Sequence, residues 1–175
     1  QIDLAAAEGI EVIRSNASAL WGNAAGGVIN VLTVPRYDER GLEAQPIFGS
    51  YGMARYAVRG QRPLGNGTGY FSFVNTSFDG WRAHSSARRA LVTVGTQGIV
   101  GERTKVGFHA SGANNLFQIP GPLTWAQFQA DPRAANATYA SRDERRYNRL
   151  ARVAGTVEHQ LGVATTLSAV LFVNP

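Results

Sequence analysis

Apolar and polar residues alternate along the chain from about residue 42 onward, with the period of two that β-strands have. In the segment 53–62, the two sets of alternating positions are Ala54, Tyr56 and Val58 on one face and Arg55, Arg59 and Gln61 on the other. The pattern predicts seven strands, at about 42–50, 53–62, 70–78, 87–98, 104–116, 147–160 and 163–173. We therefore expect a mainly β fold.

The connections between these segments differ in length in a regular way. Short turns are expected near 63–69, 101–102 and 161–162, and Asn66-Gly67 is the strongest hairpin signal in the first of them. Longer connections near 79–86 and 117–146 fall between the short ones. Short turns at one end and longer loops at the other are typical of membrane β-barrels. A soluble sandwich has alternating strands too, but its polar faces lie on the outside.

The first 33 residues follow another pattern. Two apolar, β-forming segments at 10–13 and 28–32 flank a stretch rich in glycine and alanine. Glycine permits positive φ and close approach of backbones, so we expect a strand, one helical turn around 18–21, a tight turn and a second strand. A phosphate-binding loop is excluded, because Val28 follows Gly27 where such a loop needs lysine.

Residues 10–33 read IEVIRSNASALWGNAAGGVINVLT. This string resembles the end of the plug domain of TonB-dependent outer-membrane receptors, whose pattern is roughly I-E-V-x-R-G-P-x-S-x-L-Y-G-x-x-A-x-G-G-V-I-N-x-x-T. Four residues depart from it: Ser15-Asn16 replaces Gly-Pro, Trp21 replaces Tyr, and Gly9 stands where Arg is frequent. The stretch between Gly22 and the Gly26-Gly27 pair is also one residue shorter than in the pattern. The resemblance implies three regions, namely the C-terminal part of a plug domain (1–35), a hinge (36–41) and the N-terminal part of a transmembrane β-barrel (42–175).

Barrels of this family have about 22 strands around a plugged lumen. Seven strands correspond to the first third of such a barrel, so we expect the chain to be a piece of a longer protein. Gln1 and Pro175 agree with this expectation, since Gln1 is not an initiator residue and Pro175 ends an apolar strand.

The resemblance also implies a function and a location. A receptor of this kind sits in the bacterial outer membrane among lipid and lipopolysaccharide, binds a scarce metal chelate and imports it with energy supplied by TonB. The segment that contacts TonB lies outside this chain. The cargo expected from the loops is a ferric siderophore or ferric citrate, with cobalamin or a saccharide as a second possibility. Two different functions also fit the strand pattern: a signalling sensor of the same build, and a non-transporting secreted sandwich or adhesin.

Two loop segments contain the candidate ligand residues. Residues 79–85 read DGWRAHS and resemble the second outer loop of ferric-chelate receptors, which makes Trp81, Arg82 and His84 candidates. Arginine offers fork-shaped donors to carboxylate or catecholate oxygens. A structural corner, with Trp81 in an interfacial aromatic girdle, is the alternative.

The second segment begins at Leu116 and resembles the third outer loop of an iron-chelate subset of the family. Thr124 is placed to cap a short helix over 125–130. The candidates here are Trp125, Arg142, Arg145 and Arg146; a solvated loop or contact with lipid phosphates is the alternative. Arg14 matches the plug arginine that faces barrel carboxylates; an exposed arginine at a strand end is its alternative.

Composition excludes several further functions. The net charge is +5, and all 17 basic residues except Lys105 are arginines. They are scattered through alternating strands, which argues against nucleic-acid binding. The chain has no cysteine, and its three histidines do not have metal-ligand spacing. No G-x-S-x-G elbow is present. We therefore expect neither an enzyme nor a bound cofactor or metal.

Overall fold

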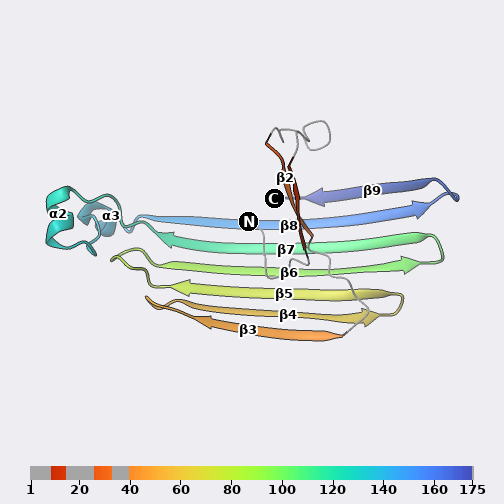
Figure 1. The fold of residues 1–175 in the computed structure, drawn as a ribbon, viewed down its shortest axis with the longest axis horizontal. Coiled ribbons are helices and arrows are strands. Elements are labelled where there is room, and N and C mark those ends of the chain that lie inside the picture. Colours follow the sequence, from red (N-terminus) through yellow and green to blue (C-terminus); the bar gives the residue numbers. More distant parts are fainter. Residues whose placement is uncertain (1–8, 15–25, 33–39, 175) are drawn as a thin grey trace.

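A computed structural model describes residues 9–14, 26–32 and 40–174. Two antiparallel sheets make up its β structure (Figure 1). The small sheet pairs β1 (Gly9–Ile13) with β2 (Val28–Leu32). The large sheet contains seven strands in chain order: β3 (Gly41–Phe48), β4 (Ala54–Leu64), β5 (Gly67–Phe78), β6 (Ala87–Val100), β7 (Thr104–Gln118), β8 (Arg145–Gln160) and β9 (Thr166–Val173).

These strands confirm the mainly β prediction and the seven predicted strands. The boundaries differ most at β5, which begins three residues earlier than expected, and at β9, which begins three residues later. The strands expected at 10–13 and 28–32 are also present and pair with each other. The helical turn expected at 18–21, the departures at Ser15-Asn16 and Trp21, and most of the hinge lie outside the described residues.

The turn predicted at 63–69 is present between β4 and β5, but its loop residues differ from the strongest local signal. Leu64 pairs with Gly67, so the two loop residues are Gly65 and Asn66 rather than Asn66 and Gly67. The positive φ of 59° belongs to Gly65, as in a type II′ turn, which has glycine at its first central position. Gly67 serves another purpose: a Cβ there would lie 2.2 Å from the Gln97 carbonyl oxygen. The glycine therefore lets β5 approach β6.

Two of the three connections at one end of the sheet are longer than any at the other end, as the sequence predicts, and the short connection 49–53 is the exception. The turns after β4, β6 and β8 lie at one end (Figure 1). The connections 49–53, 79–86 and 119–144 lie at the other end, which we call the loop end. The last of them contains α2 (Trp125–Ala130) and α3 (Ala137–Ser141). No helix in the described ranges is long and apolar enough to cross a membrane.

One face of the large sheet, here the apolar face, is almost free of polar side chains over four consecutive cross-strand rows. The pairing register defines these rows, since directly paired residues project to the same side. One row contains Ala44, Val58, Phe73, Val92, Gly112 and Ala151, and the next contains Leu42, Gly60, Phe71, Val94, Ala110, Val153 and Val173. Large side chains here are exposed, among them Phe73 at 43% and Val153 at 45%.

The two rows nearer the short turns complete this apolar region. They contain Gly69, Thr96, Phe108, Gly155 and Leu171, together with Leu64, Gly67, Gly98, Val106, Val157 and Ala169. Arg62, beside Gly69, is the one charged residue in the four rows of the described sheet. Its position near the turn end lets a long side chain extend its charge toward water.

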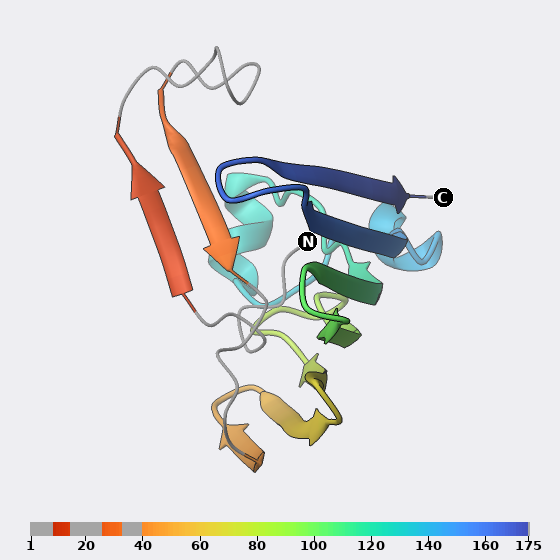
Figure 2. The ribbon, with the colours of Figure 1, turned by 90° about the vertical axis from the view of Figure 1, so that its right-hand side faces the viewer.

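The opposite face, here the polar face, contains charged and hydroxyl side chains and buries a narrow core. The core is one cross-strand row, Ala57, Val74, Leu91, Ala113 and the half-buried Leu150. The adjacent row begins with Glu43 and Arg59, whose side chains form an ion pair at 2.6 Å. Seen nearly along the strands, the sheet bends rather than lying flat (Figure 2).

Tyr70 crosses the polar face over a glycine to reach His109. Tyr70 on β5 is paired with Gly95 on β6, which is paired with His109 on β7. The Tyr70 hydroxyl and His109 Nδ1 are hydrogen-bonded at 3.0 Å. A Cβ on Gly95 would lie 2.3 Å from the Tyr70 ring and its hydroxyl oxygen. The missing side chain thus leaves room for a bond across three strands.

We expect Gly95→Ala to destabilise the sheet by about 1–3 kcal/mol, because the new methyl group must displace the buried Tyr70 ring. The midpoint of urea unfolding measures this loss. Gly162→Ala is the matched control, since a Cβ there has no described atom within 4 Å. Equal midpoints for the two variants would contradict the steric role of Gly95.

Candidate functional site

The connections 79–86 and 119–144 pack on each other and form what we call the loop layer. Arg82 joins them: its Nε and Nη2 atoms donate to the Ala134 carbonyl oxygen at 3.1 and 2.8 Å. The Ala83 backbone N–H donates to the Arg133 carbonyl oxygen at 2.8 Å. Two segments about 50 residues apart are therefore held together by side-chain and backbone donors.

His84 makes a second link within the loop layer. Its Nε2 atom lies 3.0 Å from the Glu144 carbonyl oxygen and 3.8 Å from a carboxylate oxygen of Asp143, and its side chain is only 11% exposed. Both His84 and Asp143 have positive φ, at 54° and 51°. Arg145 forms an ion pair with the same Asp143 carboxylate. These polar contacts therefore hold in place the residues that lead into the start of β8.

The two short helices are held by caps rather than by an apolar core. Thr124 caps α2 in a capping box with Gln127, which confirms the predicted helix and its cap. Asn136 caps α3, and its Nδ2 atom donates to the Pro122 carbonyl oxygen at 3.0 Å. Gly121, with a φ of 68°, leaves space that the Tyr139 ring fills. Helix α3 was not predicted, although asparagine before it is a favoured N-cap signal.

Several side chains of the loop layer face solvent and can contact a ligand. Trp125 is 73% exposed and stacks on Phe128 of the same helix, with ring centroids 5.8 Å apart. Trp81 is 42% exposed. Arg142, which follows α3, is also exposed. Aromatic faces together with a guanidinium group suit a planar or anionic ligand, through stacking and forked hydrogen bonds.

The predicted ligand residues thus divide into two groups. Arg82, His84 and Arg145 are joined to the backbone or to Asp143 within the loop layer. Trp81, Trp125 and Arg142 are exposed there, whereas Arg146 is exposed on β8 and belongs to the polar face. Arg14 is exposed just after β1. Ligand binding by all seven loop and strand residues, and the plug–barrel contact of Arg14, remain predictions.

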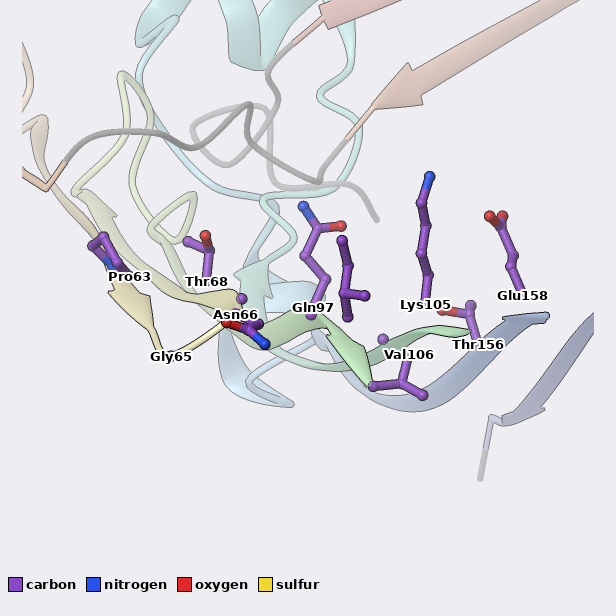
Figure 3. Close-up of a pocket in the computed structure, with 13 residues that line it drawn as sticks. Pro63, Gly65, Asn66, Thr68, Gln97, Lys105, Val106, Thr156 and Glu158 are labelled. Atoms are coloured by element: carbon purple, nitrogen blue, oxygen red, sulfur yellow. The ribbon is translucent and has the colours of Figure 1, made fainter. Parts of the chain in front are cut away.

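A separate hollow of about 690 Å³ lies at the short-turn end. Lys105 and Glu158 are directly paired on β7 and β8 there. Figure 3 shows their side chains rising from the same side of the sheet as that of Gln97, while Val106 points the other way. The hollow is therefore a mixed-charge surface of the polar face, at the end of the sheet opposite the predicted ligand residues.

Within the described ranges, no group of three or more His, Cys, Asp or Glu side chains is arranged to hold a metal ion. No known family model matches this sequence.

We expect Arg82→Ala to loosen the loop layer, because it removes both donors to the Ala134 carbonyl. A hydrogen bond to a charged group contributes about 1.5 kcal/mol, so hydrogen exchange across 119–144 should speed up roughly tenfold. Arg133→Ala is the matched control: its side chain is exposed, and the variant keeps the backbone carbonyl that Ala83 uses. Unchanged exchange in Arg82→Ala would mean that the loop layer does not depend on this contact.

Proposed function

We propose that this chain belongs to a TonB-dependent outer-membrane receptor, with 1–35 in the plug domain and 42–175 in the first part of the barrel. The observation that carries the proposal is the apolar face of the large sheet. Successive rows are two residues apart along each strand, so the four rows span about eight residues per strand. A tilted membrane strand needs about 9–11 residues. The next row toward the loop end is mixed, with Tyr56 and Ala90 beside Arg149.

The borders of this region also support a membrane location. Phe48, Tyr56 and Tyr147 lie on the apolar face near the loop end, where membrane barrels have an aromatic girdle. The short turns lie at the other end, as periplasmic turns do. The long connections then face the outside. On this proposal, the loop layer is the part that meets an external ligand.

The polar face and the small sheet support the plug assignment. In a plugged barrel the inner face is polar, and here it contains Glu43, Arg59, Lys105, Arg152 and Glu158. The β1–β2 hairpin lies at the positions expected from the plug pattern, with Asn30 Nδ2 donating to the Glu11 carboxylate at 3.0 Å. Gly27 has a φ of 125°, and a Cβ there would lie 2.6 Å from the Ile13 carbonyl oxygen. This agrees with the glycine pair of the pattern.

The cargo we propose is a ferric siderophore or ferric citrate. Such complexes are bulky and expose carboxylate, hydroxamate or catecholate oxygens, which stacked aromatic rings and arginine forks recognise. Uptake requires binding first and then a shift of the plug from a closed to an open population, with TonB supplying the energy. The chain's residues bind and position the chelate, and no covalent bond is made or broken.

Spin labelling at an introduced cysteine distinguishes a membrane wall from a soluble sandwich, and this chain contains no cysteine of its own. We attach a nitroxide to Val94→Cys in the purified complete protein, return the protein to outer-membrane lipid, and expect the label to collide with dissolved oxygen and to be shielded from a polar nickel chelate. A label at Gln97→Cys, an exposed residue of the polar face on the same strand, should collide with the nickel chelate. In a sandwich a second sheet would cover Val94, so that shielding of its label from both oxygen and the nickel chelate would refute the membrane assignment.

The cargo is tested by uptake and by binding. Deleting the gene should abolish TonB-dependent uptake of ferric citrate, a ferric trihydroxamate or a ferric tricatecholate. For the chelate whose uptake is lost, we expect Trp125→Ala to weaken binding to the purified full-length receptor about thirtyfold and Arg142→Ala about tenfold. The first variant removes an aromatic anchor and the second a charged donor, and losses of about this size follow from removing such groups.

Arg103→Ala, in the turn at the opposite end, is the matched control and should bind normally. Normal uptake of all three chelates together with loss of cobalamin or saccharide uptake would replace the iron cargo by that second possibility. Normal affinity of both loop variants would refute the assignment of these residues.

A further inference from the structure

Three arginines gather on the apolar face where it meets the loop end. Arg88 on β6 shares a row with Leu116 and Tyr147, and Arg149 on β8 lies in the next row. Arg145, also on β8, is paired with Gln118 one row closer to the loops. All three arginines are exposed. We call this group the outer arginine cluster.

The register sets the spacing of the cluster. β6 and β8 are separated only by β7, so Arg88 and Arg149 lie on strands about 10 Å apart, and successive rows are about 7 Å apart. The Arg149 guanidinium carbon lies over the Tyr147 ring, 4.6 Å from its centroid. This contact holds Arg149 against the face of the sheet. Arg88 and Arg149 can therefore reach a single anionic group, or two neighbouring ones, on the outside of the sheet.

The charge of this face favours an anion. Among the described strands of the large sheet, the apolar face contains Arg62, Arg88, Arg145 and Arg149 but no aspartate or glutamate. Arg145 pairs with Asp143 of the loop layer. Arginine matches phosphate oxygens with its planar fork and is less strongly hydrated than lysine.

The surface beside the cluster, on the side of the short turns, favours a hydrocarbon ligand. Phe73, Val92 and Ala151 form the row that follows Arg149 toward the short turns, and Phe71, Val94 and Val153 form the next. A ligand that fits both parts has phosphate groups joined to acyl chains. A free anion would use only the arginines, and a neutral lipid only the apolar rows.

We propose that Arg88 and Arg149 bind the phosphates of a phosphorylated lipid of the outer leaflet, whose acyl chains lie along Phe73, Val92 and Ala151. The lipid site rests on the proposed function, because it requires the apolar face to lie in the membrane and the loop end to face outward. It is distinct from the chelate site, which lies in the loop layer. The bound lipid thereby fixes the depth of the barrel wall.

The test uses the full-length receptor in detergent and lipid A as the probe, a glycolipid with two phosphates. Binding is measured by native mass spectrometry for the natural protein and for Arg88→Gln/Arg149→Gln. Each arginine–phosphate contact is charge-assisted and worth about a factor of ten, so we expect roughly hundredfold weaker binding of lipid A by the double variant. Removal of both phosphates from the lipid should weaken its binding to the natural protein similarly.

Arg62→Gln, on the same face at the opposite end, is the matched control and should keep normal affinity. Unchanged affinity in the double variant, or an equal loss in Arg62→Gln, would overturn the site. Displacement of lipid A by inorganic phosphate at equal concentration would also overturn it, because a free anion would then be a sufficient ligand. Shielding of a Val94→Cys spin label from both oxygen and the nickel chelate would refute the membrane assignment itself, whereas oxygen access to that label with unchanged lipid A affinity would refute only the lipid site.

Discussion

The unbroken register of seven antiparallel strands is the constraint on which the rest of this structure depends. Every residue from β3 to β9 is assigned to a face by its pairing, because side chains alternate with a period of two. A slip of one residue at a strand pair would bring arginines such as Arg59 or Arg152 among the apolar rows and would turn Phe73 or Val153 to the polar face. Glycines on β5 and β6 assist the register, since Gly67 leaves space for the Gln97 carbonyl and Gly95 leaves space for the Tyr70 ring.

The loop layer depends on this sheet in turn. Its two connections leave from β5 and β7, strands that both pair with β6, so their first residues begin close together. The Gln118 N–H donates to the Ser86 carbonyl oxygen, and the Ile119 N–H donates to that of Glu144, which extends the sheet pairing into the loops. Further out, caps and side-chain donors replace the strand pairing. The seven-stranded sheet thus supports a loop layer with few buried apolar side chains.

The sequence predicts the strands well because their signal is local. Val106, Phe108 and Ala110 oppose Lys105, His109 and Ser111 as expected, and the register confirms it. The partners of Arg82 and His84 were beyond such reasoning, since they are backbone carbonyls 52 and 60 residues away. A carbonyl has no sequence signature. The position of the β4–β5 turn has a related cause. Asn66-Gly67 has the strongest local turn preference, but pairing along the whole of β4 and β5 determines which two residues form the turn.

The buried apolar row on the polar face has a consequence for the passage of ions along that face. Ala57, Val74, Leu91, Ala113 and Leu150 cross five strands side by side and interrupt the hydroxyl and charged groups on either side of them. A hydrated ion that crosses the row anywhere from β4 to β8 meets no polar side chain of the row, whereas Gln45 continues the row on β3. Narrow apolar constrictions exclude water by dewetting. If an apolar surface lies against the row, the contact between them forms a dry seam that blocks the flow of ions across the row, while the polar surfaces on both sides stay hydrated.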